Sequence, residues 1–210
     1  MPLPSVSSEG DGVADCRELE IVTIFFSSDL HLRHTNTWAL FKNPDGTPLR
    51  PFTSTEEMDE CMIQRHNEVV RPSDHWYCLG DVSMMRPRFV ARQLNAMNGH
   101  KRLIRGNHDI YKTKEYLEFF DEIYGIRVID NILFTHIPVH PRCMGGFAAN
   151  VHGHIHAGPD LEPAVGLRGK EQKVVVMPYI NIVVEKTDYR PVSLEELKTE
   201  ASYGPRPYNR

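Results

Sequence analysis

The sequence predicts an α/β (α+β) fold, and three observations lead to that prediction. Short β-branched and aromatic runs alternate with stretches of helical periodicity in the first half of the 210-residue chain. The second half is richer in strands than in helices. A chain of this length can also bury a substantial core, because folding hides roughly 70% of the unfolded surface at this size.

The first half alternates strand and helix. The expected elements are a buried strand over 20–27, a polar loop over 30–53, a helix over about 55–70, a strand over 75–79, a helix over 87–97 and a strand over 101–105. Ser54 and Glu57 have capping-box spacing at the start of the first helix, and Pro72 stops it. In the second helix, Phe89, Val90, Leu94 and Met97 are expected to face inward.

The second half contains mostly strand patterns. Residues 126–129 and 132–135 flank Asp130-Asn131, as in a hairpin. Residues 174–177 and 180–185 flank a second break at Pro178-Tyr179. A short helix over 193–199 is expected to be capped by Ser193.

Composition suggests one domain over residues 17–200, with a disordered arm over 1–16 and a tail over 201–210. The N-terminus lacks a signal peptide pattern, and the longest apolar run, 21–26, is too short to span a bilayer, so a cytoplasmic protein without membrane contact is expected. The four cysteines form no CxxC pair and are expected to be reduced thiols. The net charge of −4 disfavours extensive nucleic-acid binding.

Five short motifs contain residues that commonly bind metals, and each follows a hydrophobic run. In order they are Asp29-Leu30-His31, Gly80-Asp81, Gly106-Asn107-His108-Asp109, His136 and Gly153-His154-Ile155-His156. None of them is specific alone. Together they supply the carboxylate, amide and imidazole groups that two divalent ions require. They should gather beyond the carboxyl ends of the strands, where α/β sheets form their sites.

The spacing within two of the motifs suggests how each pair of ligands is presented. In an extended segment, side chains two residues apart point to the same side. Asp29 and His31 would therefore point the same way, and so would His154 and His156. Each pair could then reach one cluster from a single strand end.

This order of motifs resembles that of the calcineurin-like metallophosphoesterases, and in particular their small single-domain bacterial and bacteriophage members. The segment Tyr189-Arg190-Pro191-Val192-Ser193-Leu194-Glu195-Glu196 resembles the ending of those small members, so the likeness covers roughly residues 21–197. The resemblance implies a sandwich of two mixed β-sheets, packed face to face, with helices outside.

The resemblance also implies a role for each motif residue. Asp29, His31 and His156 would bind a first metal, Asn107, His136 and His154 a second, and Asp81 would bridge both. His108 would stabilise charge developing on phosphorus and protonate the leaving oxygen, while Asp109 would either orient His108 or cap the following helix. Arg33, His34 and Arg142 are candidate substrate-binding residues. Arg33 departs from the family pattern, because it replaces a glycine common in the small members.

The activity implied is hydrolysis of a small phosphodiester or nucleotide by direct attack of a metal-bound hydroxide. Manganese is the first choice of metal, with iron, zinc and nickel left open by the mixed nitrogen and oxygen ligand set. A nuclease acting on DNA or RNA, a phosphomonoesterase and a non-catalytic scaffold of the same fold are the alternatives. The loops over 30–53 and 137–150 are expected to shape the substrate pocket. The sequence does not predict an oligomeric state.

Overall fold

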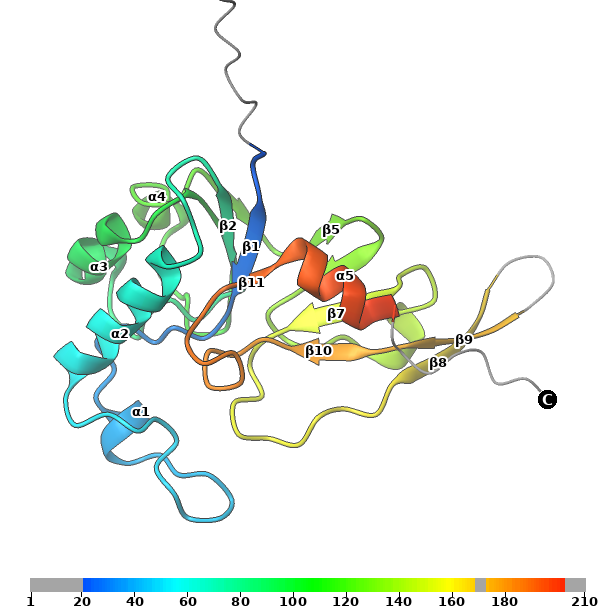
Figure 1. The fold of residues 1–210 in the computed structure, drawn as a ribbon, viewed down its shortest axis with the longest axis horizontal. Coiled ribbons are helices and arrows are strands. Elements are labelled where there is room, and N and C mark those ends of the chain that lie inside the picture. The colour runs from blue at the N-terminus through cyan, green and yellow to red at the C-terminus, as the bar shows by residue number, and fades with distance from the viewer. Residues whose placement is uncertain (1–20, 169–172, 203–210) are drawn as a thin grey trace, which may run out of the picture.

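The computed structural model describes residues 21–168 and 173–202 and confirms the expected fold class (Figure 1). Two mixed β-sheets lie face to face, with helices outside them. The predicted arm over 1–16 and most of the predicted tail lie outside the described residues. The last helix continues to Ser202, one residue past the predicted start of that tail.

The first sheet has the strand order β11-β1-β2-β3-β4. Its strands are β11 (Val192–Ser193), β1 (Ile24–Ser27), β2 (His75–Cys78), β3 (His100–Ile104) and β4 (Glu122–Tyr124). β1 to β4 run parallel, and β11 adds to β1 in the antiparallel direction. The carboxyl ends of β1, β2 and β3 therefore meet at one edge of this sheet.

The second sheet has the order β10-β7-β6-β5. Its strands are β10 (Tyr179–Asn181), β7 (Ala149–His152), β6 (Ile132–Phe134) and β5 (Arg127–Ile129). β10, β7 and β6 run parallel, while β5 and β6 form the predicted hairpin. Asp130 and Asn131 both have left-handed φ values, 48° and 65°, as a two-residue hairpin turn with right-handed strand twist requires.

A separate antiparallel ribbon, formed by β8 (Ala164–Arg168) and β9 (Lys173–Met177), extends away from the two sheets (Figure 1). The break predicted at Pro178-Tyr179 is confirmed only at Pro178, because β10 already begins at Tyr179 and ends at Asn181 instead of 185, and the strands on either side of the break do not pair. β9 pairs with β8, whereas β10 pairs with β7. β4, β8 and β11 had no predicted counterpart. β4 and β11 are strands of three and two residues, and β8 pairs only with β9, so each depends on a neighbouring strand for its hydrogen bonds.

The helices lie mainly on the outer face of the first sheet. They are α1 (Asn36–Ala39), α2 (Thr55–Asn67), the 3₁₀ turn η1 (Pro87–Val90), α3 (Ala91–Ala96), α4 (Thr113–Tyr116), the 3₁₀ turn η2 (Pro141–Cys143) and α5 (Leu194–Ser202). Ser54 Oγ accepts a hydrogen bond of 3.1 Å from the Glu57 N–H, and Ser193 caps α5 in the same way, as predicted. None of the described helices combines the length and apolarity needed to cross a membrane.

Two hydrophobic layers hold this arrangement together. One packs α2 and α3 against β1, β2 and β3, with Met58, Met62 and Trp76 fully buried within it. The other fills the space between the sheets, where the Phe26 and Phe134 rings stack 4.1 Å apart. Burial of each such side chain contributes about 1.5–3 kcal/mol, so the inter-sheet layer fixes how the two sheets align.

Several expectations about the first half were wrong in detail. The loop expected over 30–53 contains α1, and the helix expected to run to about residue 70 ends at Asn67. The strand predicted from residue 20 begins only at Ile24, because its neighbour β2 begins opposite that residue. The helix predicted over 87–97 starts as a 3₁₀ turn, and Phe89 is 50% exposed instead of inward-facing. A 3₁₀ turn rotates successive side chains further than an α-helix does, which moves Phe89 off the face that Val90 and Leu94 share.

Candidate metal centre

The predicted ligand segments meet at the carboxyl ends of strands from both sheets. Asp29, Asp81 and Asn107 follow β1, β2 and β3, whereas His136 and His154 follow β6 and β7. A parallel bridge between Ser28 and Val183 joins the two sheets at this point. The structure therefore brings the seven predicted ligand residues together at these strand ends, and their role as ligands stays a prediction.

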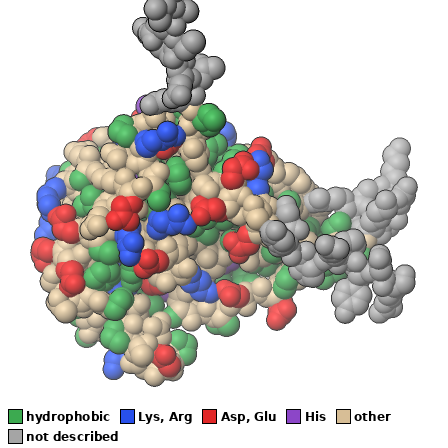
Figure 2. Space-filling view, in the orientation of Figure 1, with side chains coloured by type: hydrophobic (Ala, Val, Ile, Leu, Met, Phe, Trp, Pro, Cys, Tyr) green, Lys and Arg blue, Asp and Glu red, His purple; other side chains and the backbone are tan. Residues whose placement is uncertain are grey.

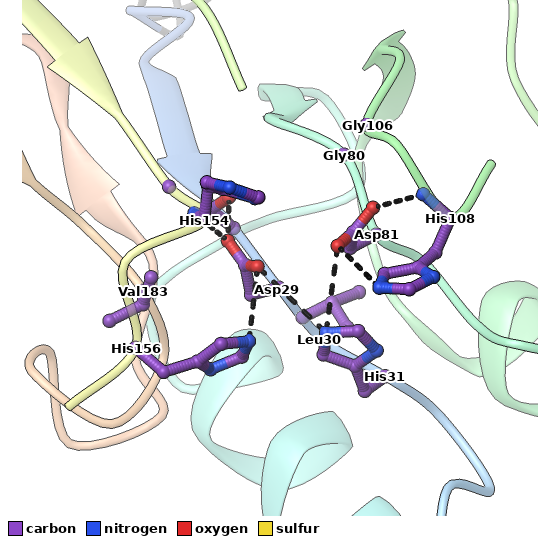
Figure 3. Close-up of polar contacts among 12 residues, drawn as sticks. Asp29, Leu30, His31, Gly80, Asp81, Gly106, His108, His154, His156 and Val183 are labelled. Atoms are coloured by element: carbon purple, nitrogen blue, oxygen red, sulfur yellow. Dashed lines mark hydrogen bonds and ion pairs between the residues drawn. The ribbon is translucent and has the colours of Figure 1, made fainter. Parts of the chain in front are cut away.

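One side of the cluster is built around Asp29. Its Oδ1 atom lies 3.4 Å from His156 Nε2 and 3.8 Å from His31 Nε2. Its Oδ2 atom accepts hydrogen bonds from Ser28 Oγ at 2.5 Å and from the backbone N–H of His154 at 2.9 Å. Figure 3 shows His31 between the Asp29 and Asp81 carboxylates, in contact with both.

The other side of the cluster is built around Asp81. Its Oδ2 atom lies 3.7 Å from His31 Nε2 and 3.4 Å from His136 Nε2. His136 Nε2 also lies 2.8 Å from Asn107 Oδ1, and the His154 ring contacts the His136 ring at a centroid distance of 5.2 Å. Asp81 Oδ2 thus lies between the two groups of predicted ligands.

The hydrogen bond of His136 to the backbone fixes which ring nitrogen faces the other predicted ligands. His136 Nδ1 must donate to the Leu79 carbonyl, which only accepts, so a neutral His136 turns the Nε2 lone pair towards the Asn107 and Asp81 oxygens. Asp29 Oδ1 is buried and has no hydrogen-bond partner among the described residues. A cation satisfies such a set, so these buried Asp and His groups could hold a metal ion.

The electrostatics of the cluster support the same conclusion. Burial raises the pKa of Asp29, which lies in the most enclosed part of the site. Burial also lowers the pKa of His31 to about 3, with the nearby Arg50 charge adding to the effect, so this imidazole stays neutral. Burial opposes the shift at His136, but its contact with Asp81 raises its pKa. Burial thus disfavours an isolated negative charge on Asp29, and a cation beside that carboxylate would offset the cost.

The backbone that presents these ligands is not extended, contrary to the expectation for Asp29–His31 and His154–His156. Asp29, His31, Asp81 and His154 have left-handed φ values of 60°, 47°, 54° and 71°. Such values cost a non-glycine residue free energy and persist only where surrounding contacts impose them. Arg33, which stands where the resembled phosphoesterases commonly have glycine, also has φ 59°, a conformation that glycine would adopt easily.

Two motif glycines allow the ligand loops to approach each other closely. A Cβ atom on Gly106 would collide with the Asp81 carboxylate and backbone, and one on Gly153 would collide with Ser28 Oγ and Asp29 Oδ2. Neither position has room for any side chain. The motif glycines therefore set the distance between neighbouring ligand loops.

His108 lies at the edge of the cluster. Its backbone N–H donates to Asp81 Oδ1 at 2.9 Å, while its half-exposed ring places Nε2 4.0 Å from Asp81 Oδ2 (Figure 3). The ring also meets the His31 ring edge-on, with centroids 5.6 Å apart. The backbone of His108 thus holds a predicted ligand, and its ring faces the open side.

Asp109 takes neither of the two roles weighed for it. It makes no described hydrogen bond to the His108 ring, and α4 begins four residues later, beyond its reach as a cap. Instead its buried carboxylate accepts from the backbone N–H groups of Gly106 at 2.8 Å, Asp81 at 2.9 Å and Val82 at 3.1 Å. Asp109 therefore joins the Gly80-Asp81 loop to the Gly106-Asn107 loop.

The three candidate substrate-binding residues lie in different surroundings. The His34 ring lies 5.5 Å from the His31 ring, and its Nδ1 atom has no hydrogen-bond partner among the described residues. The exposed Arg33 side chain turns away and donates to the Phe89 carbonyl at 3.4 Å. Arg142 is exposed in η2. Among the described residues, only His34 of these three contacts a predicted ligand.

Sequence reasoning missed a buried ion pair that supports the site. Arg50 is fully buried, and its guanidinium donates to the Asp29 carbonyl at 2.6 Å, to the Leu30 carbonyl at 2.8 Å and to Glu185 Oε1 at 2.7 Å. Glu185 Oε1 in turn accepts from His156 Nδ1 at 3.1 Å, which directs His156 Nε2 towards Asp29. Burial alone would raise the pKa of Glu185, but Arg50 and His156 lower it to about 2. No local pattern distinguishes Arg50 within its long polar loop.

Replacing Glu185 with glutamine is expected to weaken metal binding about 10–100-fold, the usual effect of losing the carboxylate that orients a ligating histidine. The protein should also lose stability, because the Arg50 charge would stay buried without its partner. Calorimetric titration with manganese and thermal unfolding measure the two effects. Glu68→Gln, which breaks a surface pair with Arg65, is the matched control and should change neither. Unchanged manganese affinity in folded Glu185→Gln protein would refute this role.

The fold and the cluster define the class: a two-sheet α/β protein with a buried Asp/His site that could hold metal. No family model matches the chain. The chain belongs to the same family as the uncharacterized protein MJ1445 of Methanocaldococcus jannaschii, with 31% identity over 179 residues, 82% of this chain and 87% of that protein.

Two solved structures are also similar to this chain. The protein of unknown function AQ665 from Aquifex aeolicus superposes with a TM-score of 0.62 and 25% identity, over 86% of this chain and 100% of that one. A conserved uncharacterized protein of Streptococcus pneumoniae TIGR4, described as a predicted phosphoesterase, gives a TM-score of 0.32 and 15% identity over 76% of this chain and 71% of that one. The first likeness supports the fold, and the second is too weak to support an argument.

Proposed function

We propose that this chain is a metal-dependent phosphoesterase of the calcineurin-like superfamily, which hydrolyses a small phosphodiester or nucleotide with two divalent ions. One observation carries the proposal. Two buried carboxylates, Asp29 and Asp81, converge with imidazole nitrogens at 3.4–3.8 Å, and Asp29 Oδ1 has no other partner among the described residues. Buried unpaired carboxylate oxygens are costly, so a cation is their natural complement.

The ligand assignment follows the two sides of the cluster. Asp29, His31 and His156 would hold the first ion, and Asn107, His136 and His154 the second. Asp81 would bridge them, because its Oδ2 atom lies at similar distances from His31 Nε2 and His136 Nε2, 3.7 and 3.4 Å. Manganese is the proposed metal, since it accepts this mixture of carboxylate, amide and imidazole ligands.

His108 and Asp109 would have separate roles in the proposed reaction. When bound, the ions would polarise a phosphoryl oxygen and make a water molecule more acidic. The half-exposed His108 ring would donate a hydrogen bond to charge developing on the phosphoryl group and a proton to the leaving oxygen. Asp109 would act as a positioning residue, because it fixes the loops that carry Asp81 and Asn107.

Charge distribution favours a small substrate over a long nucleic acid. The chain has a net charge of −4, and on the face shown in Figure 2 the basic side chains are interspersed with acidic ones. Proteins that neutralise many phosphates need clustered Lys and Arg and bind less tightly as salt increases. His34 is the proposed residue for contacting the substrate phosphate, since its ring contacts His31 at the cluster.

The test is a comparison of three substrates with the manganese-loaded protein. Bis-nitrophenyl phosphate, a diester, is expected to be hydrolysed faster than nitrophenyl phosphate, a monoester, with little change between low and physiological salt. Long DNA should bind weakly and should not be cut efficiently. No hydrolysis of either nitrophenyl ester would contradict the proposal. Tight, salt-sensitive DNA binding with fast cleavage would support the nuclease alternative instead.

A further inference from the structure

A cavity of about 350 Å³ adjoins the cluster on the side of the proposed second ion. Asn107 and His136 belong both to the cluster and to the cavity wall. The rest of the wall comes from the segments after β3, between β4 and β5, and after β6. Of the two loops expected to shape the pocket, 137–150 contributes only Ile137 and Val139 to this wall, and 30–53 contributes nothing.

The wall is apolar where it faces the open side. Ile126 and Ile137 are 60% and 51% exposed, which leaves two large hydrophobic side chains beside a polar cluster. Gly125, which also lines the cavity, leaves open space where a side chain would stand. These features favour contact with an uncharged group of a ligand, because burying apolar surface at the two isoleucines is favourable.

Two polar side chains of the wall, Arg105 and Thr135, already form hydrogen bonds within the protein. The Arg105 guanidinium donates to the backbone carbonyls of Asp109 and Tyr111. The Thr135 hydroxyl donates to the Ile137 carbonyl at 2.8 Å and accepts from Asn150 Nδ2 at 2.9 Å. A positively charged substituent in this cavity would meet the Arg105 guanidinium, whose hydrogen-bond partners are neutral carbonyls, and would find no counter-charge among the residues of the wall.

We propose that this cavity binds one ester substituent of the phosphoester substrate, and that this substituent is an uncharged, largely apolar group about the size of one ring. The proposal rests on the proposed function, which places the phosphoryl group beside Asn107 and His136. The cavity lies at the small end of the range for ligand pockets, roughly 300–1,000 Å³, which suits a single ring better than an extended chain. The preferred substrates are then diesters with an aryl or single-base substituent.

Calorimetric titration of the manganese-loaded full chain with two phosphonates tests the proposal without relying on turnover. Methylphosphonate and phenylphosphonate share the anionic group and differ in the substituent. Phenylphosphonate is expected to bind at least about 10-fold more tightly, which corresponds to burial of one ring. Equal affinities would overturn the proposed cavity role and leave the proposed function intact. No binding of either phosphonate would overturn both.

Two variants locate the preference within the cavity. Gly125 has no left-handed φ, and a Cβ there meets nothing within 4 Å, so Gly125→Leu should fold and occupy part of the cavity. Ile137→Ser removes apolar wall without adding bulk. Both should reduce the preference for phenylphosphonate and leave methylphosphonate binding unchanged. Val165→Ser, at a position 68% exposed on β8, is the matched control and should keep the full preference. A preference that persists in both cavity variants would refute the proposal.

Discussion

Removal of divalent metal with a chelator is expected to abolish phosphoester hydrolysis, and manganese is expected to restore it. The reason is the cluster itself, because Asp29 and Asp81 place two buried carboxylates beside the imidazole nitrogens of His156 and His31, a donor set that a divalent ion can accept. Metal content, measured by mass spectrometry alongside activity, should rise towards two manganese ions per chain as activity returns.

Manganese should also stabilise the folded protein, by about 2.7 kcal/mol at a free concentration 100 times the dissociation constant. Thermal unfolding with and without the ion measures this. Magnesium is the comparison ion, and it should restore less activity, because it binds imidazole poorly. Full activity in protein whose metal content is confirmed near zero would rule out the proposed mechanism.

His108→Ala is expected to lower turnover about 10²–10⁴-fold, the range for a lost general acid. Metal binding should be preserved, because His108 contacts Asp81 Oδ1 through its backbone N–H, which alanine retains. The loss should be smaller for substrates with good leaving groups, since these need less help from a proton donor. Turnover of a series of substituted phenyl esters, with metal content measured in parallel, tests both statements.

His100→Ala provides the control for this variant. The His100 side chain is exposed and lies 3.9 Å from Asp121 at the start of β3, outside the cluster. Its replacement should leave both turnover and metal content unchanged. If His108→Ala loses metal while His100→Ala does not, then His108 is a ligand and the assigned role is wrong.

The sequence predicted that the candidate ligands would lie close together, because their arrangement depends on topology. Once β1, β2 and β3 run parallel, Asp29, Asp81 and Asn107 must meet at their common edge. It did not predict how the ligands are presented, because left-handed φ values at Asp29 and His31 are imposed by contacts with the Gly80–Val82 segment. The residues around Asp29 and His31 do not by themselves indicate that these contacts with a distant segment will form.

The sequence likewise did not predict which residues far apart in the chain would contact each other. Arg50 and Glu185 are 135 residues apart, and nothing near either residue marks it as half of a buried pair. Asp109 belongs to a motif, so the sequence drew attention to it. Its partners, however, include the backbone N–H groups of Asp81 and Val82, which follow β2 and not β3. Motif recognition finds residue types, whereas tertiary contacts decide what each residue does.

The division of the ligands between two sheets bears on when the site can form. Asp29 from the first sheet receives a hydrogen bond from His154 of the second, and the Ser28–Val183 bridge joins the sheets beside it. During synthesis, more than half of the chain that follows Asp29 must therefore be made before the residues that contact Asp29 in the second sheet are present. An ion would meet the complete set of proposed ligands only after the two sheets have docked, so metal binding would be a late step in folding and would depend on correct assembly of both sheets.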